Sequence, residues 1–167
     1  MKTKTIFLVT VGDHMHGTID PRLTSKGRDQ INRLSVAKML PTEPYLVVRG
    51  TGQRHRDAAD ILGWENVDCR DIKDSQKIRL SQACGHADVK VGEKILTGSG
   101  DYALKYFLIP DTRPFLMEQE DQTVLIVDQI FMMGLGMTDS KPASIYEAAY
   151  EAGANTGYKC ELIYSAN

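Results

Sequence analysis

Basic side chains gather where the chain leaves a short apolar run and passes through two glycines. Arg49 ends the apolar run, and Arg54, His55 and Arg56 follow the glycines. Backbone N–H groups at a helix N-terminus attract anions, and glycine allows a ligand to approach the backbone closely. The pattern is therefore a candidate anion-binding site at the start of a helix expected over residues 53–62. We expect a first helical turn whose charges face the solvent, with the anion site kept as the alternative.

A second candidate is the pair His14-x-His16, which follows another apolar run. On an extended chain alternate side chains share one face, so two imidazoles there could bind Zn²⁺ or Mn²⁺ and activate a water molecule. Enzymes in which a His-x-His pair follows the first strand need further metal ligands, and they usually have a barrel of about 250 residues. We expect two exposed loop histidines and no metal, with the metal site kept as the alternative.

Three runs rich in β-branched residues predict buried strands, at residues 5–11, 45–48 and 123–127. Each run is continuously apolar rather than alternating. This is typical of strands that are covered on both faces in a parallel sheet. A fourth strand is expected over residues 158–164, near the end of the sequence.

Helices are expected between these strands. Thr24 is suited to N-cap a helix that stops at Pro41, and residues 53–62, closed by a glycine, predict a second helix. The apolar spacing of residues 144–152 predicts a third. The alternation of strands and helices predicts one α/β domain over residues 1–167, with three α/β/α layers and a mainly parallel central sheet.

The composition is that of a globular domain. The 167 residues are 42% hydrophobic and 25% charged, and the formal net charge is −2. This balance argues against disorder, and it provides no general attraction to nucleic acid or to an anionic membrane. No apolar stretch approaches the roughly 20 residues that cross a bilayer. Three cysteines without a C-x-x-C pair predict neither a disulfide framework nor a cysteine zinc site, which fits a reducing cytoplasm.

The order of these pieces resembles the short form of the histidine phosphatase superfamily, also called phosphoglycerate mutase-like. That family follows its first strand with Arg-His-Gly-Glu, and here the matching stretch is Thr10-Val11-Gly12-Asp13. The family then begins a helix with D-x-x-L-T-x-x-G, which Asp20 to Gly27 match. The resemblance implies a phosphoglycerate mutase-like α/β fold.

The resemblance also implies that the nucleophile is missing. In the family a neutral histidine attacks phosphorus and becomes phosphorylated, while arginines neutralise the phosphate oxygens. At the matching positions the first arginine becomes Thr10 and the histidine becomes Val11. Valine has no lone pair and cannot attack phosphorus. Gly12 is retained, and Asp13 replaces the family glutamate.

The remaining family positions are also altered. The second arginine is retained as Arg54, but the second histidine becomes Gln129 and the serine before it becomes Asp128. The pocket implied by this alignment would carry one positive charge from Arg54 and two negative charges from Asp13 and Asp128. A phosphate dianion would meet net repulsion there.

We therefore expect a catalytically inactive histidine-phosphatase-like protein with a binding or regulatory role and no cofactor. The partner is expected to be a small ligand or another protein, neither nucleic acid nor membrane. The alternatives are an active phosphatase with a non-standard nucleophile and a metal-dependent hydrolase that uses His14 and His16. The expected binding residues are Thr10, Val11, Gly12, Asp13, Arg54, Asp128 and Gln129.

Overall fold

The computed structural model describes residues 3–15, 20–70, 88–91, 94–97, 112–137, 139–151 and 158–167. The sequence before Pro110 also predicts a helix over residues 102–109, and these residues lie outside the described ranges. None of the helices in this part of the chain is long and apolar enough to cross a membrane.

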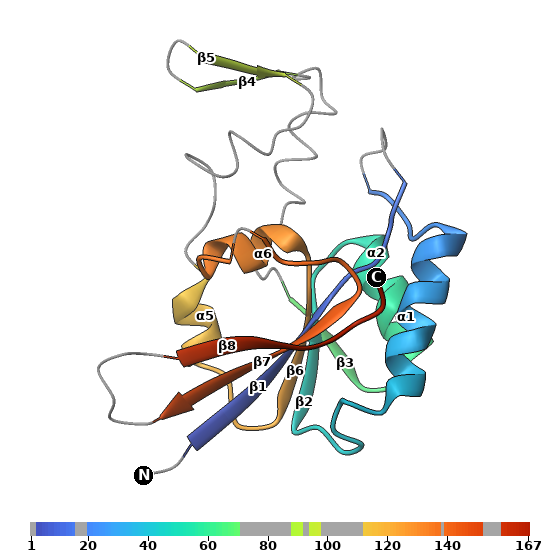
Figure 1. Cartoon of the computed structure of the whole chain (residues 1–167), viewed down its shortest axis with the longest axis vertical. Helices are drawn as coiled ribbons and strands as arrows, with labels where there is room; N and C mark the ends of the chain where they lie inside the picture. The colour runs from blue at the N-terminus through green and yellow to red at the C-terminus, as the bar shows by residue number, and fades with distance from the viewer. Residues whose placement is uncertain are drawn as a thin grey trace.

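Six strands of the described chain form one mixed sheet in the order β3-β2-β6-β1-β7-β8 (Figure 1). The pairs β3/β2, β2/β6 and β6/β1 are parallel, and the pairs β1/β7 and β7/β8 are antiparallel. The prediction of a mainly parallel sheet is confirmed. The strands are β1 (Thr3–Thr10), β2 (Leu46–Arg49), β3 (Val67–Cys69), β6 (Thr123–Val127), β7 (Ser144–Glu151) and β8 (Tyr158–Ser165). The short strands β4 (Asp88–Val91) and β5 (Lys94–Thr97) form a separate antiparallel pair.

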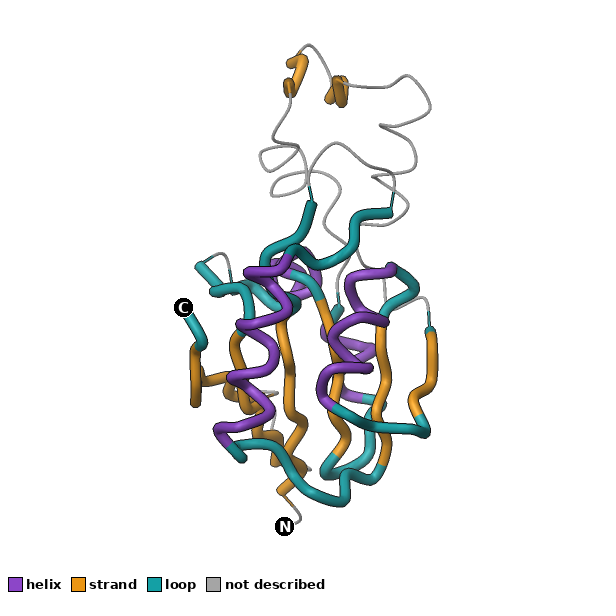
Figure 2. Tube along the Cα trace, turned by 90° about the vertical axis from the view of Figure 1, so that its right-hand side faces the viewer, coloured by secondary structure: helices purple, strands orange, loops and turns teal. Residues whose placement is uncertain are grey.

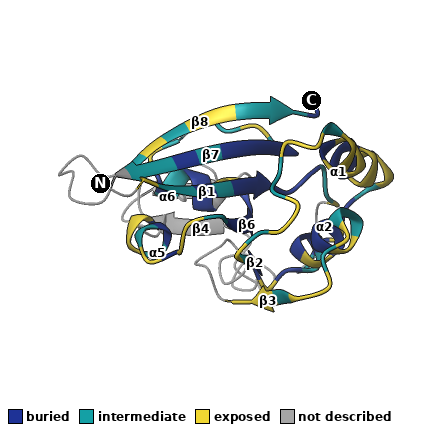
Figure 3. Cartoon of the chain, turned by 90° about the horizontal axis from the view of Figure 1, so that it is seen from below, coloured by how far each residue is buried: buried dark blue, intermediate teal, exposed yellow. Residues whose placement is uncertain are grey.

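Helices cover both faces of the sheet, as the three-layer prediction requires (Figures 2 and 3). The helices α1 (Ser25–Ala37) and α2 (Gln53–Leu62) pack on one face, and α5 (Arg113–Met117) and α6 (Gln129–Gly134) lie on the other. All five residues of β6 are buried, because this strand lies between β2 and β1 and is covered from both sides. The continuously apolar sequence of β6 follows from this position.

The two helices on the first face begin as predicted, and α2 also ends as predicted. Helix α1 ends at Ala37 rather than at Pro41, because Lys38, with φ of 54°, adopts the left-handed conformation of a C-cap. The Thr24 side chain accepts a hydrogen bond from the Gly27 N–H and caps α1. Helix α2 ends at Gly63, whose φ of 84° lies in the left-handed region that glycine adopts without strain.

The prediction of a helix over residues 144–152 is wrong, because Ser144–Glu151 forms strand β7. The strand pairs with β1 on one side and β8 on the other, with Ile6 opposite Ala148. Ile145 packs into the core on one face of the sheet, and Ala148 packs into the core on the other. The alanines have good helix propensity, but pairing with two neighbouring strands outweighs that local preference.

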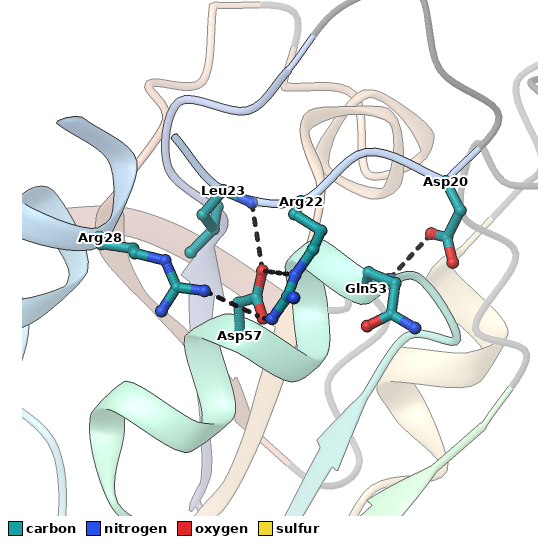
Figure 4. A network of polar contacts seen from close by, with 6 residues as sticks. All are labelled: Asp20, Arg22, Leu23, Arg28, Gln53 and Asp57. Carbon is teal, nitrogen blue, oxygen red and sulfur yellow. Dashed lines mark hydrogen bonds and ion pairs between the residues drawn. The ribbon is translucent and has the colours of Figure 1, made fainter. Parts of the chain in front are cut away.

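The loop after β1 is fastened to α2 by one buried carboxylate (Figure 4). Asp57 is 2% exposed and accepts hydrogen bonds from Arg22 Nη2 at 2.8 Å and from the Leu23 N–H at 3.2 Å. Arg28 adds an ion pair at 3.5 Å. Burial by itself raises the pKa of Asp57, but the bonds from Arg22 and Leu23 outweigh it and hold the pKa below its ordinary value. The network therefore orients α2, which carries three of the basic residues singled out above, Arg54, His55 and Arg56.

Replacing Asp57 with Asn should lower the free energy of unfolding by about 1–3 kcal/mol, because a buried hydrogen-bonded carboxylate is lost. Urea unfolding at pH 7 measures this. The matched control is Asp60→Asn on the exposed side of the same helix, which should change stability by less than about 0.5 kcal/mol. The difference in unfolding free energy between wild type and Asp57→Asn should be full above the ordinary carboxyl pKa and should be lost as the pH falls through the depressed folded pKa of Asp57, where the carboxylate becomes protonated. Equal stability of the two variants at pH 7 would contradict the role given to Asp57.

Candidate functional site

The predicted site residues lie at the carboxyl ends of three parallel strands. Thr10 ends β1, Asp128 follows β6, and Arg54 stands in the first turn of α2 after β2. The N–H of Val11 donates to Val127 O at 3.0 Å, so the segments after β1 and β6 leave the sheet side by side. In open α/β sheets this edge is the usual ligand-binding site.

Arg54 and Asp128 form a buried ion pair. Arg54 Nη2 lies 2.8 Å from Asp128 Oδ2, and the side chains are 0% and 6% exposed. The other carboxylate oxygen of Asp128 accepts the Phe131 N–H at 3.0 Å and caps α6. A Cβ atom on Gly52 would stand 2.7 Å from Arg54 Nη1, so glycine makes room for the guanidinium. The guanidinium of Arg54, which the resemblance aligns with a family arginine, is thus held by a carboxylate of the protein itself.

His55 is completely buried beside this pair. Burial and the positive charge of Arg54 lower the pKa of His55 to about 3, so the imidazole is neutral at physiological pH. The expectation of a solvated first turn is therefore wrong for Arg54 and His55, whereas Arg56 is exposed. The sequence does contain a signal for this burial. Ala58 packs inward, and it follows His55 by three residues and Arg54 by four, so all three residues share one face of the helix.

Thr10 and Val11 are part of the protein interior. The Thr10 hydroxyl donates to Lys141 O at 2.7 Å and accepts the Ser144 N–H at 3.0 Å, which joins β1 to the segment before β7. Val11 is 2% exposed and belongs to the apolar core under α1 and α2. An aliphatic side chain therefore occupies the position that the resemblance assigns to the nucleophile.

Gly12 and Asp13 are packed against the start of α1. A Cβ atom on Gly12 would lie 2.9 Å from Gly27 O, and one on Gly27 would lie 2.0 Å from Asp13 O. Both glycines are therefore required for this close backbone approach. Asp13 Oδ2 accepts the Thr24 hydroxyl at 2.6 Å, and the Asp13 N–H donates to Gln30 Oε1 at 3.0 Å. These contacts direct the Asp13 carboxylate to the N-cap of α1.

More exposed polar groups surround this buried centre. Gln129 is exposed and donates from Nε2 to Ser140 O at 2.6 Å. His14 is half-buried, with Nδ1 3.3 Å from Gly12 O, and Arg49 is also half-buried. His16 lies outside the described residues. Within the described ranges no three His, Cys, Asp or Glu side chains gather as a metal would require.

The buried histidine should make folding sensitive to mild acid. Its folded pKa lies below its unfolded value near 6.5, so the unfolded chain binds a proton first and stability falls as the pH drops below 6.5. The contribution of His55 should amount to about 2 kcal/mol between pH 6.5 and pH 5. Urea unfolding at several pH values measures it. The loss should be absent in His55→Asn and retained in His14→Gln; an unchanged pH profile in His55→Asn would contradict the assignment.

The structure was compared with known proteins. No family model and no curated protein matches the sequence. Solved structures match over nearly the whole chain. Phosphoserine phosphatase from Entamoeba histolytica, solved with 3-phosphoglyceric acid, is 12% identical with a TM-score of 0.59, covering 96% of this chain and 95% of that one.

Two mycobacterial structures are similar to the same degree. Glucosyl-3-phosphoglycerate phosphatase is 13% identical with a TM-score of 0.58, covering 99% of this chain and 100% of that one. A protein described as mycobacterial hydrolase 1 is 14% identical with a TM-score of 0.58, covering 98% and 99%. At identities this low, the structural similarity establishes the architecture alone. The chemistry of this chain must be argued from its own side chains. The chain therefore has the phosphoglycerate mutase-like α/β fold of these solved structures, as its sequence pattern predicts.

Proposed function

We propose that this protein is a catalytically silent member of the fold and works by binding a small ligand or a protein partner at the carboxyl edge of the sheet. The observation that carries the proposal is Val11, buried at the end of β1. Covalent phosphoryl transfer needs a side chain with a lone pair at that place, and an isopropyl group supplies none.

The charge around Arg54 supports the same proposal. Transition-state stabilisation in phosphoryl transfer depends on positive charge directed at the phosphate oxygens. The guanidinium of Arg54 instead lies 2.8 Å from the Asp128 carboxylate. An arriving phosphate would have to displace that carboxylate and leave it buried beside a second anion, which is costly at low dielectric.

The binding surface that remains is polar. The side chains near the buried ion pair are more accessible: His14 and Arg49 are half-buried and Gln129 is exposed. Thr51, two residues after Arg49, is also exposed. These side chains offer hydrogen bonds and one permanent positive charge. They suit recognition of a polar group rather than turnover of a phosphate ester.

Active hydrolysis by another histidine is the competing function. His55 is neutral, as a nucleophile must be, but it is completely buried. His14 is the more accessible group, and with His16 it would form the alternative metal site. Stoichiometric zinc or manganese in the purified protein, lost in His14→Ala, would favour that hydrolase.

The first test is turnover of a generic aryl phosphate. The wild-type protein should release no phenol above a heat-denatured control, and no phosphohistidine should form, because the nucleophile position is aliphatic. Two variants distinguish weak activity of this chain from a contaminant. Turnover abolished by His16→Ala but unaffected by Gln129→Ala would overturn the silent assignment.

The second test rebuilds the family site. The triple variant Thr10→Arg, Val11→His and Gln129→His should create phosphate binding, and adding Asp128→Ser should strengthen it about tenfold or more by releasing Arg54. Serine preserves a side-chain acceptor for the Phe131 N–H, so the cap of α6 is retained. Calorimetric titration with inorganic phosphate measures both. If the correctly folded quadruple variant binds no phosphate, the alignment of these four positions is wrong.

A further inference from the structure

A groove runs along α1, away from the carboxyl-edge residues described above. It encloses about 620 Å³, within the range of small-molecule sites. One wall consists of Lys26, Asp29, Gln30 and Arg33, which share a helix face because they stand at positions i, i+3, i+4 and i+7. The other wall consists of Ala166 and Asn167. Figure 2 shows the C-terminal residues beside α1.

The groove is held open by hydrogen bonds between its walls. Gln30, which is 4% exposed, donates from Nε2 to Asn167 Oδ1 at 3.0 Å. Arg33 Nη1 donates to Ala166 O at 3.2 Å, and the Ala166 N–H is bound to Ala143 O at 3.0 Å. Because these hydrogen bonds fix both walls, the groove is already formed before a ligand binds. This reduces the entropy cost of ordering side chains on binding.

The charged side chains of the groove are not paired with one another. Asp29 stands three residues after Lys26 and four before Arg33, positions at which helical ion pairs commonly form. Within the described part of the chain no carboxylate lies within 4.0 Å of Lys26 Nζ or the Arg33 guanidinium. The side chains that line the groove therefore sum to a charge of +1, although the side chains of the whole chain sum to −2.

The spacing of the two cations defines what the groove can accept. Seven residues of helix separate Lys26 from Arg33, about 10 Å along the axis. Lysine and arginine only donate hydrogen bonds, whereas the Asp29 carboxylate between them only accepts. We propose that the α1 groove binds an elongated small organic dianion, with an anionic group at each end and a hydroxyl or amine between them.

The proposal can be tested by titrating the full chain with azelate and monitoring ¹H–¹⁵N NMR spectra. Azelate is an unbranched dicarboxylate whose extended length matches the spacing between Lys26 and Arg33. Malonate is the short dianion that cannot reach both cations. Azelate should bind about two- to fivefold tighter than malonate, the range expected for one additional exposed ion pair. Resonances of α1 and of residues 166–167 should shift. An alkane bisphosphonate of the same length shows whether phosphate-type ends bind better than carboxylates.

Charge-removing variants locate the site. Lys26→Gln and Arg33→Gln should each weaken azelate binding about two- to fivefold, and Asp29→Asn should not weaken it. Lys38→Gln, an equal charge change at the end of the same helix, is the matched control and should bind as wild type. All four positions are exposed, so the variants should remain folded. Equal affinity for azelate and malonate, wild-type binding by the double variant Lys26→Gln/Arg33→Gln, or shifts confined to residues 10–14 and 128–129 would overturn the proposal.

Discussion

The arrangement of residues at the carboxyl edge of the sheet depends on Arg54, whose guanidinium is completely buried. A buried charge is tolerated only when a partner of opposite charge lies close to it. Arg54 comes from α2 on one face of the sheet, and Asp128 caps α6 on the other. Their ion pair therefore joins the two helical layers at the point where β1, β2 and β6 end. Burial and the positive charge of Arg54 keep the neighbouring His55 neutral and outweigh the Asp128 carboxylate, which favours the protonated imidazole.

The residues that the resemblance aligns with the family site make structural contacts. Thr10 connects β1 to the segment before β7, Val11 fills the core, and Asp13 binds the N-cap of α1. Each of these side chains therefore contributes to the fold. The same architecture can carry different side chains at one site, consistent with the general independence of fold and function.

Helix α1 connects the edge of the sheet with the groove along its side. Gln30 is the residue shared by both, because its Oε1 accepts from the Asp13 N–H and its Nε2 donates to Asn167. On the opposite side of the same loop, Asp57 binds Arg22 and Leu23, and Asp20 accepts the Gln53 N–H (Figure 4). Residues 11–15 and 20–24, which follow β1, are consequently fixed between α1 and α2. This double attachment orients the residues at the carboxyl edge.

The sequence by itself determined the features that depend on neighbours in the chain. The apolar run of β6, the Thr24 cap and the Gly63 stop each follow from local preferences, so these elements and the α/β class could be predicted. The sequence also places Val11 where the resemblance expects a histidine. Only the tertiary structure decided that residues 144–151 form a strand, because β1 and β8 supply its hydrogen-bond partners. It also decided the pairing of Arg54 with Asp128, which are 74 residues apart, and the groove between α1 and residues 166–167. Contacts between distant segments depend on how the elements pack, and local propensities carry no information about them.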